Sequence, residues 1–130
     1  MYRHKTGPRW EHKDKEGQRV KASPSLAERY QKLKSMTVNL AYCAPESDNP
    51  PRQVTYTMNL SNAKSVVRFD CPNEECIRGD FELTKELAAA IAKRRKLVEG
   101  ELCCTGWRSK AAIRRTKCSH VLRYKLMLTY

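Results

Sequence analysis

Six cysteines carry the clearest chemistry in this chain of 130 residues, at positions 43, 71, 76, 103, 104 and 118. Cys71 and Cys76 form a tight pair, Cys103 and Cys104 are adjacent, and Cys118 comes later. In the reducing cytoplasm, where we expect this protein, such sets bind metal more often than they form disulfides. We therefore expect one structural Zn²⁺ site closed by four thiolates. Three disulfides or unliganded thiols are the alternatives.

Strand geometry selects the ligands among these cysteines. Adjacent residues on a strand point to opposite faces, so Cys103 and Cys104 cannot both enter one tetrahedral site without a bulge. Cys104 opens a Cys-x-Gly-Trp step, in which Gly106 frees the backbone to turn. The remaining cysteine, Cys43, is expected to be an ordinary small apolar residue. The predicted ligands are Cys71, Cys76, Cys104 and Cys118, with Cys103 or His120 as replacements.

The order of these cysteines resembles a zinc ribbon over about residues 65–125. In such a ribbon, a first cysteine pair and a second ligand pair close on β-strands. Here the first loop is wider than usual, a helix separates the two ligand pairs, and the second pair spans residues 104–118. The resemblance implies a small sheet stapled by metal.

Nothing in the sequence is typical of an active site. Four thiolates leave no open coordination position for a reactive water. Glu74 and Glu75 lie inside the first cysteine loop, where we expect solvated carboxylates. The zinc-deaminase pattern, the Gly-x-Ser-x-Gly turn and the glycine-rich phosphate loops are absent from the sequence. We therefore expect a protein that is not an enzyme.

The charge distribution points to a polyanionic partner. The formal net charge is +12 and the pI is about 9.7. Residues 1–35 carry +6, residues 36–82 carry −3 and residues 83–130 carry +9. Clustered basic charge of this size favours nucleic acid or a nucleoprotein as the partner.

Two basic clusters are the predicted contact sites. One is the predicted end of the main helix, and the other lies in the loop between two predicted ligands, where a metal at both ends would make a pre-organised finger. Such cations would neutralise phosphates and release counterions. Trp107, at the base of this loop, either stacks on a base or packs in the core. The predicted contact residues are Lys93, Arg94, Arg95, Lys96, Arg108, Lys110, Arg114, Arg115 and Lys117.

A protein-interaction module is the competing hypothesis. The strand predicted from Val54 to Leu60, or the last strand of the chain, would then lie at an exposed sheet edge and pair with another chain. In that case the zinc would be purely structural. Association through a strand edge should persist in salt, whereas binding to nucleic acid should weaken steeply.

The elements that must position these residues follow from the apolar pattern. Alternating polar and apolar residues predict strands at about 36–42, 54–60, 65–70, 101–107 and 120–130. Helical spacing predicts a short helix at about 25–34, with a Ser25–Glu28 capping box, and a main helix at 84–98. We expect an α+β fold with a five-stranded, mainly antiparallel sheet, covered by one main helix and closed at one end by zinc.

The same patterns divide the chain into three parts. Residues 1–22 are polar without apolar periodicity, so we expect a disordered basic arm. Residues 23–35 should form a docking helix and residues 36–130 the zinc-stapled domain. No stretch is long and apolar enough for a membrane span, and the basic start lacks the apolar segment of a secretory signal. We therefore expect no membrane partner.

Overall fold

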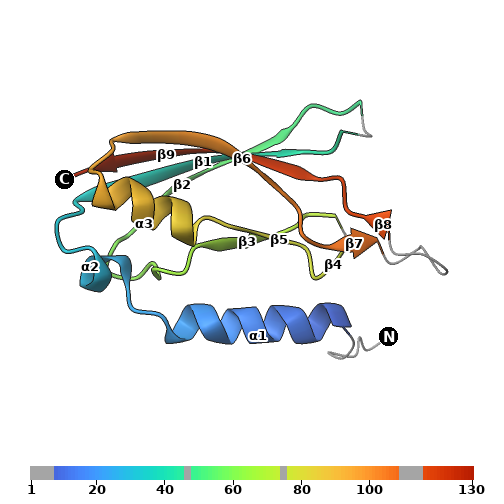
Figure 1. The fold of residues 1–130 in the computed structure, drawn as a ribbon, viewed down its shortest axis with the longest axis horizontal. Coiled ribbons are helices and arrows are strands. Elements are labelled where there is room, and N and C mark those ends of the chain that lie inside the picture. The colour runs from blue at the N-terminus through green and yellow to red at the C-terminus, as the bar shows by residue number, and fades with distance from the viewer. Residues whose placement is uncertain (1–7, 46–47, 74–75, 109–115) are drawn as a thin grey trace.

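The computed structural model describes residues 8–45, 48–73, 76–108 and 116–130 of the chain. The fold is α+β and its elements lie in three tiers (Figure 1). The upper tier is a four-stranded antiparallel sheet in the order β2-β1-β9-β6. Its strands are β1 (Ser35–Cys43), β2 (Arg52–Thr57), β6 (Leu97–Cys103) and β9 (Val121–Thr129).

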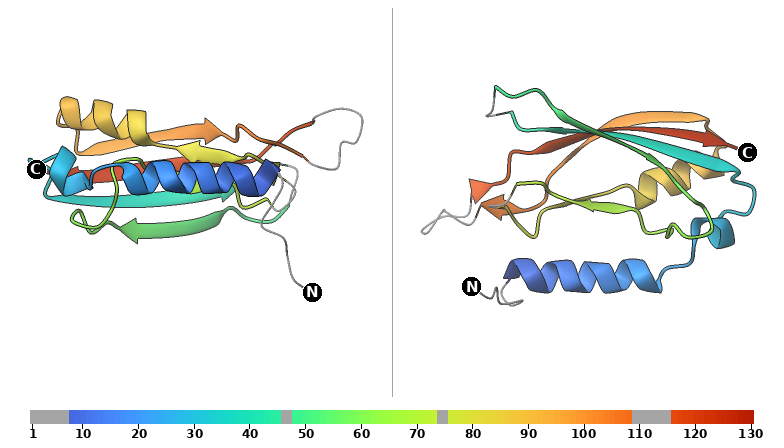
Figure 2. Two further views of the ribbon diagram at one scale, coloured as in Figure 1. Left: turned by 90° about the horizontal axis from the view of Figure 1, so that it is seen from below. Right: turned by 180° about the vertical axis from the view of Figure 1, so that it is seen from behind.

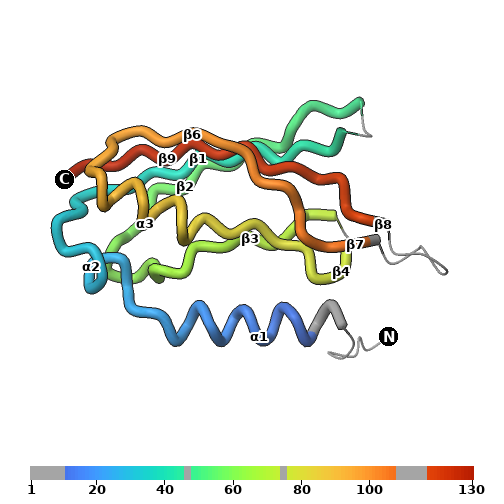
Figure 3. Tube along the Cα trace, in the orientation of Figure 1, coloured from blue at the N-terminus to red at the C-terminus, as the bar shows by residue number. Residues whose placement is uncertain are grey.

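The middle tier holds one helix and two small antiparallel sheets (Figures 1 and 2). The helix is α3 (Thr84–Ala92). One small sheet pairs β3 (Arg68–Asp70) with β5 (Asp80–Glu82). The other joins β4 (Cys76–Ile77), β7 (Trp107–Arg108) and β8 (Thr116–Lys117). The lower tier is helix α1 (Pro8–Ala22), and α2 (Leu26–Arg29) leads from it toward β1, as the trace in Figure 3 shows.

The core lies between the four-stranded sheet and the middle tier. Alternate residues of β1 and β9 point inward, among them Val38 and Leu126, which are fully buried. Leu87 of α3 and Phe81 of β5 meet them from the opposite side. Burial of each large apolar side chain stabilises the fold by about 1.5–3 kcal/mol. The main helix covers the sheet as the sequence predicts, together with β3 and β5.

The main sheet has four strands, so the prediction of five is corrected. The segment predicted as a third strand, at 65–70, forms β3 and pairs with β5 instead, in the register Phe69↔Phe81. The intervening cysteine loop returns the chain directly beside β3, so a local partner is available at low loop-closure cost. The last strand, β9, lies between β1 and β6 and is therefore central, whereas β2 is an edge.

Residues 8–22 form helix α1 where the sequence predicts a disordered arm. Apolar periodicity is absent, but the segment is rich in Lys, Arg, Glu and Gln, which favour helix. Ion pairing between Arg19 and Glu16, and a hydrogen bond from Gln18 to Asp14, add support along the helix. Within the described part of the chain, no helix is long and apolar enough to cross a membrane.

The other two helices are shorter than predicted. Ser25 accepts the Glu28 amide at 3.2 Å, as expected of the cap, but α2 ends at Arg29 rather than at 34. Helix α3 ends at Ala92 because Arg94 adopts a left-handed φ of 50°. The Arg95 amide then donates back to the Ala90 carbonyl at 2.9 Å, which is a Schellman-type ending. Residues 93–96 are therefore an exposed turn before β6 and not the last turn of a helix.

Candidate metal centre

Four cysteines from separate segments meet at one end of the molecule. Cys71 follows β3, Cys76 begins β4, Cys104 follows β6 and Cys118 precedes β9. Their sulfurs all lie within 4.8 Å of one another, and all four side chains are buried. The small β4-β7-β8 sheet holds this end together, because β4 pairs with β7 and β7 with β8. The structure thus brings together the four cysteines that the sequence selects as ligands.

The distances between the sulfurs fit a tetrahedral thiolate site. Cys71 Sγ lies 3.8 Å from Cys118 Sγ, and Cys76 Sγ lies 3.5 Å from Cys104 Sγ. Four sulfurs at about 2.3 Å from a central zinc would be separated by about 3.8 Å along each tetrahedral edge. The cluster is therefore of the size and donor type that can hold a metal ion.

Two glycines allow the backbone to pass close to these sulfurs. A Cβ at Gly79 would lie 2.1 Å from Cys76 Sγ and 2.7 Å from Cys104 Sγ. A Cβ at Gly106 would lie 2.4 Å from the Ile77 carbonyl oxygen and 2.5 Å from Cys76 Sγ. Both positions therefore exclude any side chain. Gly106 was predicted to free the turn after Cys104, whereas the role of Gly79 was missed, although the Cys-x-x-Gly spacing from Cys76 pointed to it.

Hydrogen-bond donors face two of the sulfurs. The Gly106 amide donates to Cys104 Sγ at 3.4 Å, and the Asn73 side-chain amide donates to Cys118 Sγ at 3.7 Å. The pKa of Cys104 is lowered to about 5, first because Cys71 hydrogen-bonds to it and then because of the Gly106 amide. Burial raises the pKa of Cys76 to about 12. One sulfur of the cluster is thus already favoured as a thiolate, the form that binds metal.

The alternative ligands lie outside the cluster. Cys103 is exposed on β6, as strand alternation requires when Cys104 points inward. Cys43 is a half-buried free thiol on β1. His120 Nδ1 lies 3.8 Å from Cys118 Sγ, so the ring neighbours a sulfur of the cluster without joining the four.

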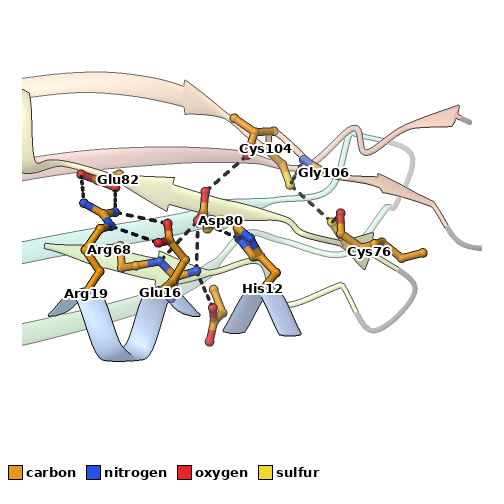
Figure 4. A network of polar contacts seen from close by, with 12 residues as sticks. His12, Glu16, Arg19, Arg68, Cys76, Asp80, Glu82, Cys104 and Gly106 are labelled. Atoms are coloured by element: carbon orange, nitrogen blue, oxygen red, sulfur yellow. Dashed lines mark hydrogen bonds and ion pairs between the residues drawn. The ribbon is translucent and has the colours of Figure 1, made fainter. Parts of the chain in front are cut away.

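A second group of polar side chains joins α1 to the β3–β5 sheet (Figure 4). His12 Nε2 lies 3.2 Å from Asp80 Oδ2. Arg68, which is nearly buried, donates to the same oxygen at 3.0 Å. Arg19 pairs with Glu16 on its own helix and with Glu82 on β5. The sequence did not indicate this group, because its members are spread over residues 1–22, which were predicted to be disordered, and two short strands.

The predicted basic contact residues that the structure describes lie at opposite ends of β9. Residues 93–96 lie where β6 begins, and Tyr130 Oη, just after β9, donates to the Arg95 carbonyl at 2.9 Å. Lys117 lies beside Trp107 at the other end of β9, next to the four cysteines. The length of β9 separates Lys117 from residues 93–96 by about 25–30 Å. The backbone of Arg108 is placed in β7, while Lys110, Arg114 and Arg115, like Glu74 and Glu75, lie outside the described residues.

Trp107 is partly exposed, and Arg78 lies over its ring, 5.9 Å from the ring centroid. Arg78 is held there by the turn between β4 and β5, in which it adopts a positive φ of 56°. A cation stacked on an aromatic ring makes a polar surface beside the cysteines. Trp107 therefore sits at the boundary between the core and this surface rather than fully inside the core.

Comparisons with known proteins give no relative for this chain. No protein-family model, curated protein or solved structure matches it. The resemblance to a zinc ribbon is therefore not established as membership of that family. On the structure alone, this chain is a small α+β protein with four clustered cysteines that can hold a metal ion.

Proposed function

We propose that this protein is a non-enzymatic module with one structural Zn²⁺, which binds nucleic acid or a nucleoprotein. The convergence of four buried sulfurs from distant segments is the observation that carries the proposal. Zinc is the metal of choice for four thiolates, and four protein ligands leave no position for a reactive water. Reduced cysteines of this kind, available to bind a metal, fit the reducing cytoplasm in which we expect this protein.

Charge supports the second half of the proposal. The chain carries +12, and its exposed cations include Lys93, Arg94, Arg95 and Lys96 at one end and Lys117 at the other. The remaining proposed contacts are Arg108, Lys110, Arg114 and Arg115, between Cys104 and Cys118. Because Lys117 and residues 93–96 are about 25–30 Å apart, one strand would need about eight or more nucleotides to reach both, at about 3.4 Å per nucleotide.

The test combines metal analysis with a salt series on one reduced preparation. We expect one zinc per chain by elemental analysis. Affinity for RNA and DNA oligonucleotides, measured by fluorescence anisotropy, should fall with salt. If the five cations between 108 and 117 each neutralise a phosphate, the slope should be about −3.5 for a single strand and about −4.5 for duplex DNA. Absence of metal refutes the first half of the proposal, and binding that is independent of salt refutes the second.

Charge reversal locates the binding site. Arg114→Glu with Arg115→Glu should weaken binding of a short oligonucleotide strongly. The control is Arg123→Glu, on the outer face of the main sheet. Arg123 forms an exposed ion pair with Glu101 there, and such pairs contribute little to stability. Equal affinities of the double variant and the control would exclude the loop as a contact.

A protein-interaction role is the second candidate, and the position of β2 favours it. This strand is an edge of the main sheet, most of its residues are exposed, and Tyr56 is 40% exposed. An edge of this kind pairs readily with another strand. The last strand, β9, was the other predicted edge, but it lies between β1 and β6 and therefore cannot pair with another chain. A dimer that persists at high salt in sedimentation experiments would favour this role.

A further inference from the structure

Helix α1 is fastened to the rest of the protein by polar contacts. None of its described side chains, at residues 11–22, is buried, and none of these residues belongs to the described core. Its links to β5 are the contact of His12 with Asp80 and the ion pair of Arg19 with Glu82. Both side chains of the Arg19 pair are substantially exposed, so salt will screen their attraction.

The contacts of α1 indicate an anchor rather than a second metal site. His12, Glu16 and Asp80 offer donor atoms within 4.8 Å of one another. However, both carboxylates are already engaged by guanidinium groups, Glu16 by Arg19 and Asp80 by Arg68. A cation at this place would compete with two fixed positive charges.

The helix lies over one side of the four-cysteine cluster. A hollow of about 10 Å³ is lined by His12 and Lys13 of α1 and, opposite them, by Cys71 and Cys76. Arg78 and Gly79 complete its wall. This volume is about the space of a single water molecule, so on the side that α1 covers, the described residues leave no room beside these two sulfurs for a larger molecule.

A short connection follows the helix. Ser23 caps the end of α1, because both its amide and its hydroxyl donate to the Val20 carbonyl. From Pro24 onward the chain is fixed, since the Pro24 carbonyl accepts the Ser65 amide and Leu26 is fully buried. Ser23 Oγ also accepts the Val66 amide at 3.4 Å. Outward movement of the helix would therefore strain or break this contact, but it would displace no described core residue.

We propose that α1 is a hinged cover of the four-cysteine centre, held closed by ion pairs, which controls the access of competing thiols and chelators to Cys71 and Cys76. The proposal rests on the metal binding proposed above and adds a control on metal exchange. When the cover opens, an external ligand can reach two of the four sulfurs, so the rate of metal transfer follows the population of the open state.

The test measures transfer of zinc from the full chain to an excess of a coloured chelator. Arg19→Gln removes the ion pair with Glu82 that joins α1 to β5, together with the pair with Glu16 inside the helix. It should speed the transfer by about two- to fivefold, as expected for loss of one exposed pair between α1 and β5. The matched control, Arg123→Gln, removes an exposed pair with Glu101 that joins β6 to β9 and does not involve α1, so it should leave the rate unchanged. High salt should speed the transfer from the wild type and narrow its difference from Arg19→Gln.

A second readout follows the helix itself. Trypsin should cut α1 faster in Arg19→Gln, at Lys13, Lys15 and Lys21, than in the wild type. If trypsin shows a loosened helix while the transfer rate stays at the wild-type value, α1 is not the cover. If neither the cleavage nor the transfer changes, Arg19 does not hold the helix, and the proposal is also overturned.

The experiments distinguish an error in the proposed zinc binding from an error in the proposed role of α1 as a cover. If the purified protein holds no zinc, labelling of its thiols replaces metal transfer as the measurement. Cys71 and Cys76 should then react faster in Arg19→Gln than in the wild type, while the exposed Cys103 reacts equally in both. Equal labelling of Cys71 and Cys76 in the two proteins refutes the cover.

Discussion

Substitution of Gly106 by alanine is the sharpest test of the cysteine geometry. The added Cβ would lie 2.4 Å from the Ile77 carbonyl oxygen, 2.5 Å from Cys76 Sγ and 2.7 Å from Gly79 Cα. Carbon atoms in contact prefer separations of about 3.5–4.0 Å. Two of the three obstacles are backbone atoms, so no flexible side chain can move aside to make room.

The magnitude follows from the size of the displacement. Relief of the clash requires shifts of about 1 Å, whereas a metal site tolerates deviations of only about 0.2 Å in its bond lengths. Overpacking at such a site costs about 3 kcal/mol, and at about 1.4 kcal/mol per factor of ten this weakens metal binding by about 100-fold. The loss should appear both in the affinity for zinc and in the free energy of unfolding of the zinc-bound protein.

The assay compares Gly106→Ala with Gly17→Ala, a matched change in helix α1. A Cβ at Gly17 meets nothing within 4 Å, and alanine should stabilise the helix by about 0.5–1 kcal/mol. Zinc affinity is measured by competition with a chelator, and stability by denaturation in urea. If Gly106→Ala binds zinc as tightly as Gly17→Ala and unfolds at the same urea concentration, the proposed arrangement of the two cysteine turns is wrong.

Three further predictions address the metal, the core and the helix. Cys104→Ser should abolish stoichiometric zinc in elemental analysis, whereas Cys103→Ser should retain it, because only Cys104 lies in the cluster. Leu126→Ala should destabilise the protein by about 2–5 kcal/mol in urea denaturation, while Leu97→Ala, at a 50% exposed position, should cost far less. The hydrogen bond from Arg19 lowers the pKa of Glu16 below 4.5. The Arg19–Glu16 pair therefore stabilises the fold at pH values above the ordinary pKa of glutamate, and this stabilisation is lost as the pH falls through the lowered pKa of Glu16. In Glu16→Gln, denaturation curves should lack the part of the acid dependence that comes from this pair.

The grouping of the cysteines could be anticipated because it depends on local rules. Strand alternation separates Cys103 from Cys104, and a glycine two residues after Cys104 marks a turn that no other residue allows. The inward faces of β1 and β9 also follow from their alternating residues. That the four cysteines bind zinc stays a prediction, as does every contact with nucleic acid.

The errors arose where partners distant in the sequence decide the structure. The main helix was predicted to reach residue 98, but residues 97–103, with Gly100 among them, form β6. A Cβ at Gly100 would meet the Tyr124 hydroxyl oxygen at 2.5 Å, so glycine is required by an aromatic ring on the next strand. No residue near position 100 in the sequence indicates that the Tyr124 ring will lie beside it. Helix α1 was missed for a similar reason, since its stabilising partners, Asp80 and Glu82, lie about sixty residues away.

The central place of β9 has a consequence for how the protein is made. In the pairing of β1 with β9, Ser35 lies opposite Thr129, almost a hundred positions away, so the sheet stays incomplete until β9 has emerged from the ribosome. Such long-range pairing makes folding slow. Cys118 lies three residues before this strand, and coordination of its sulfur beside those from earlier segments would tether the late strand to its slot before any of its hydrogen bonds form. Metal supply during synthesis would then set the speed of folding as well as the final stability.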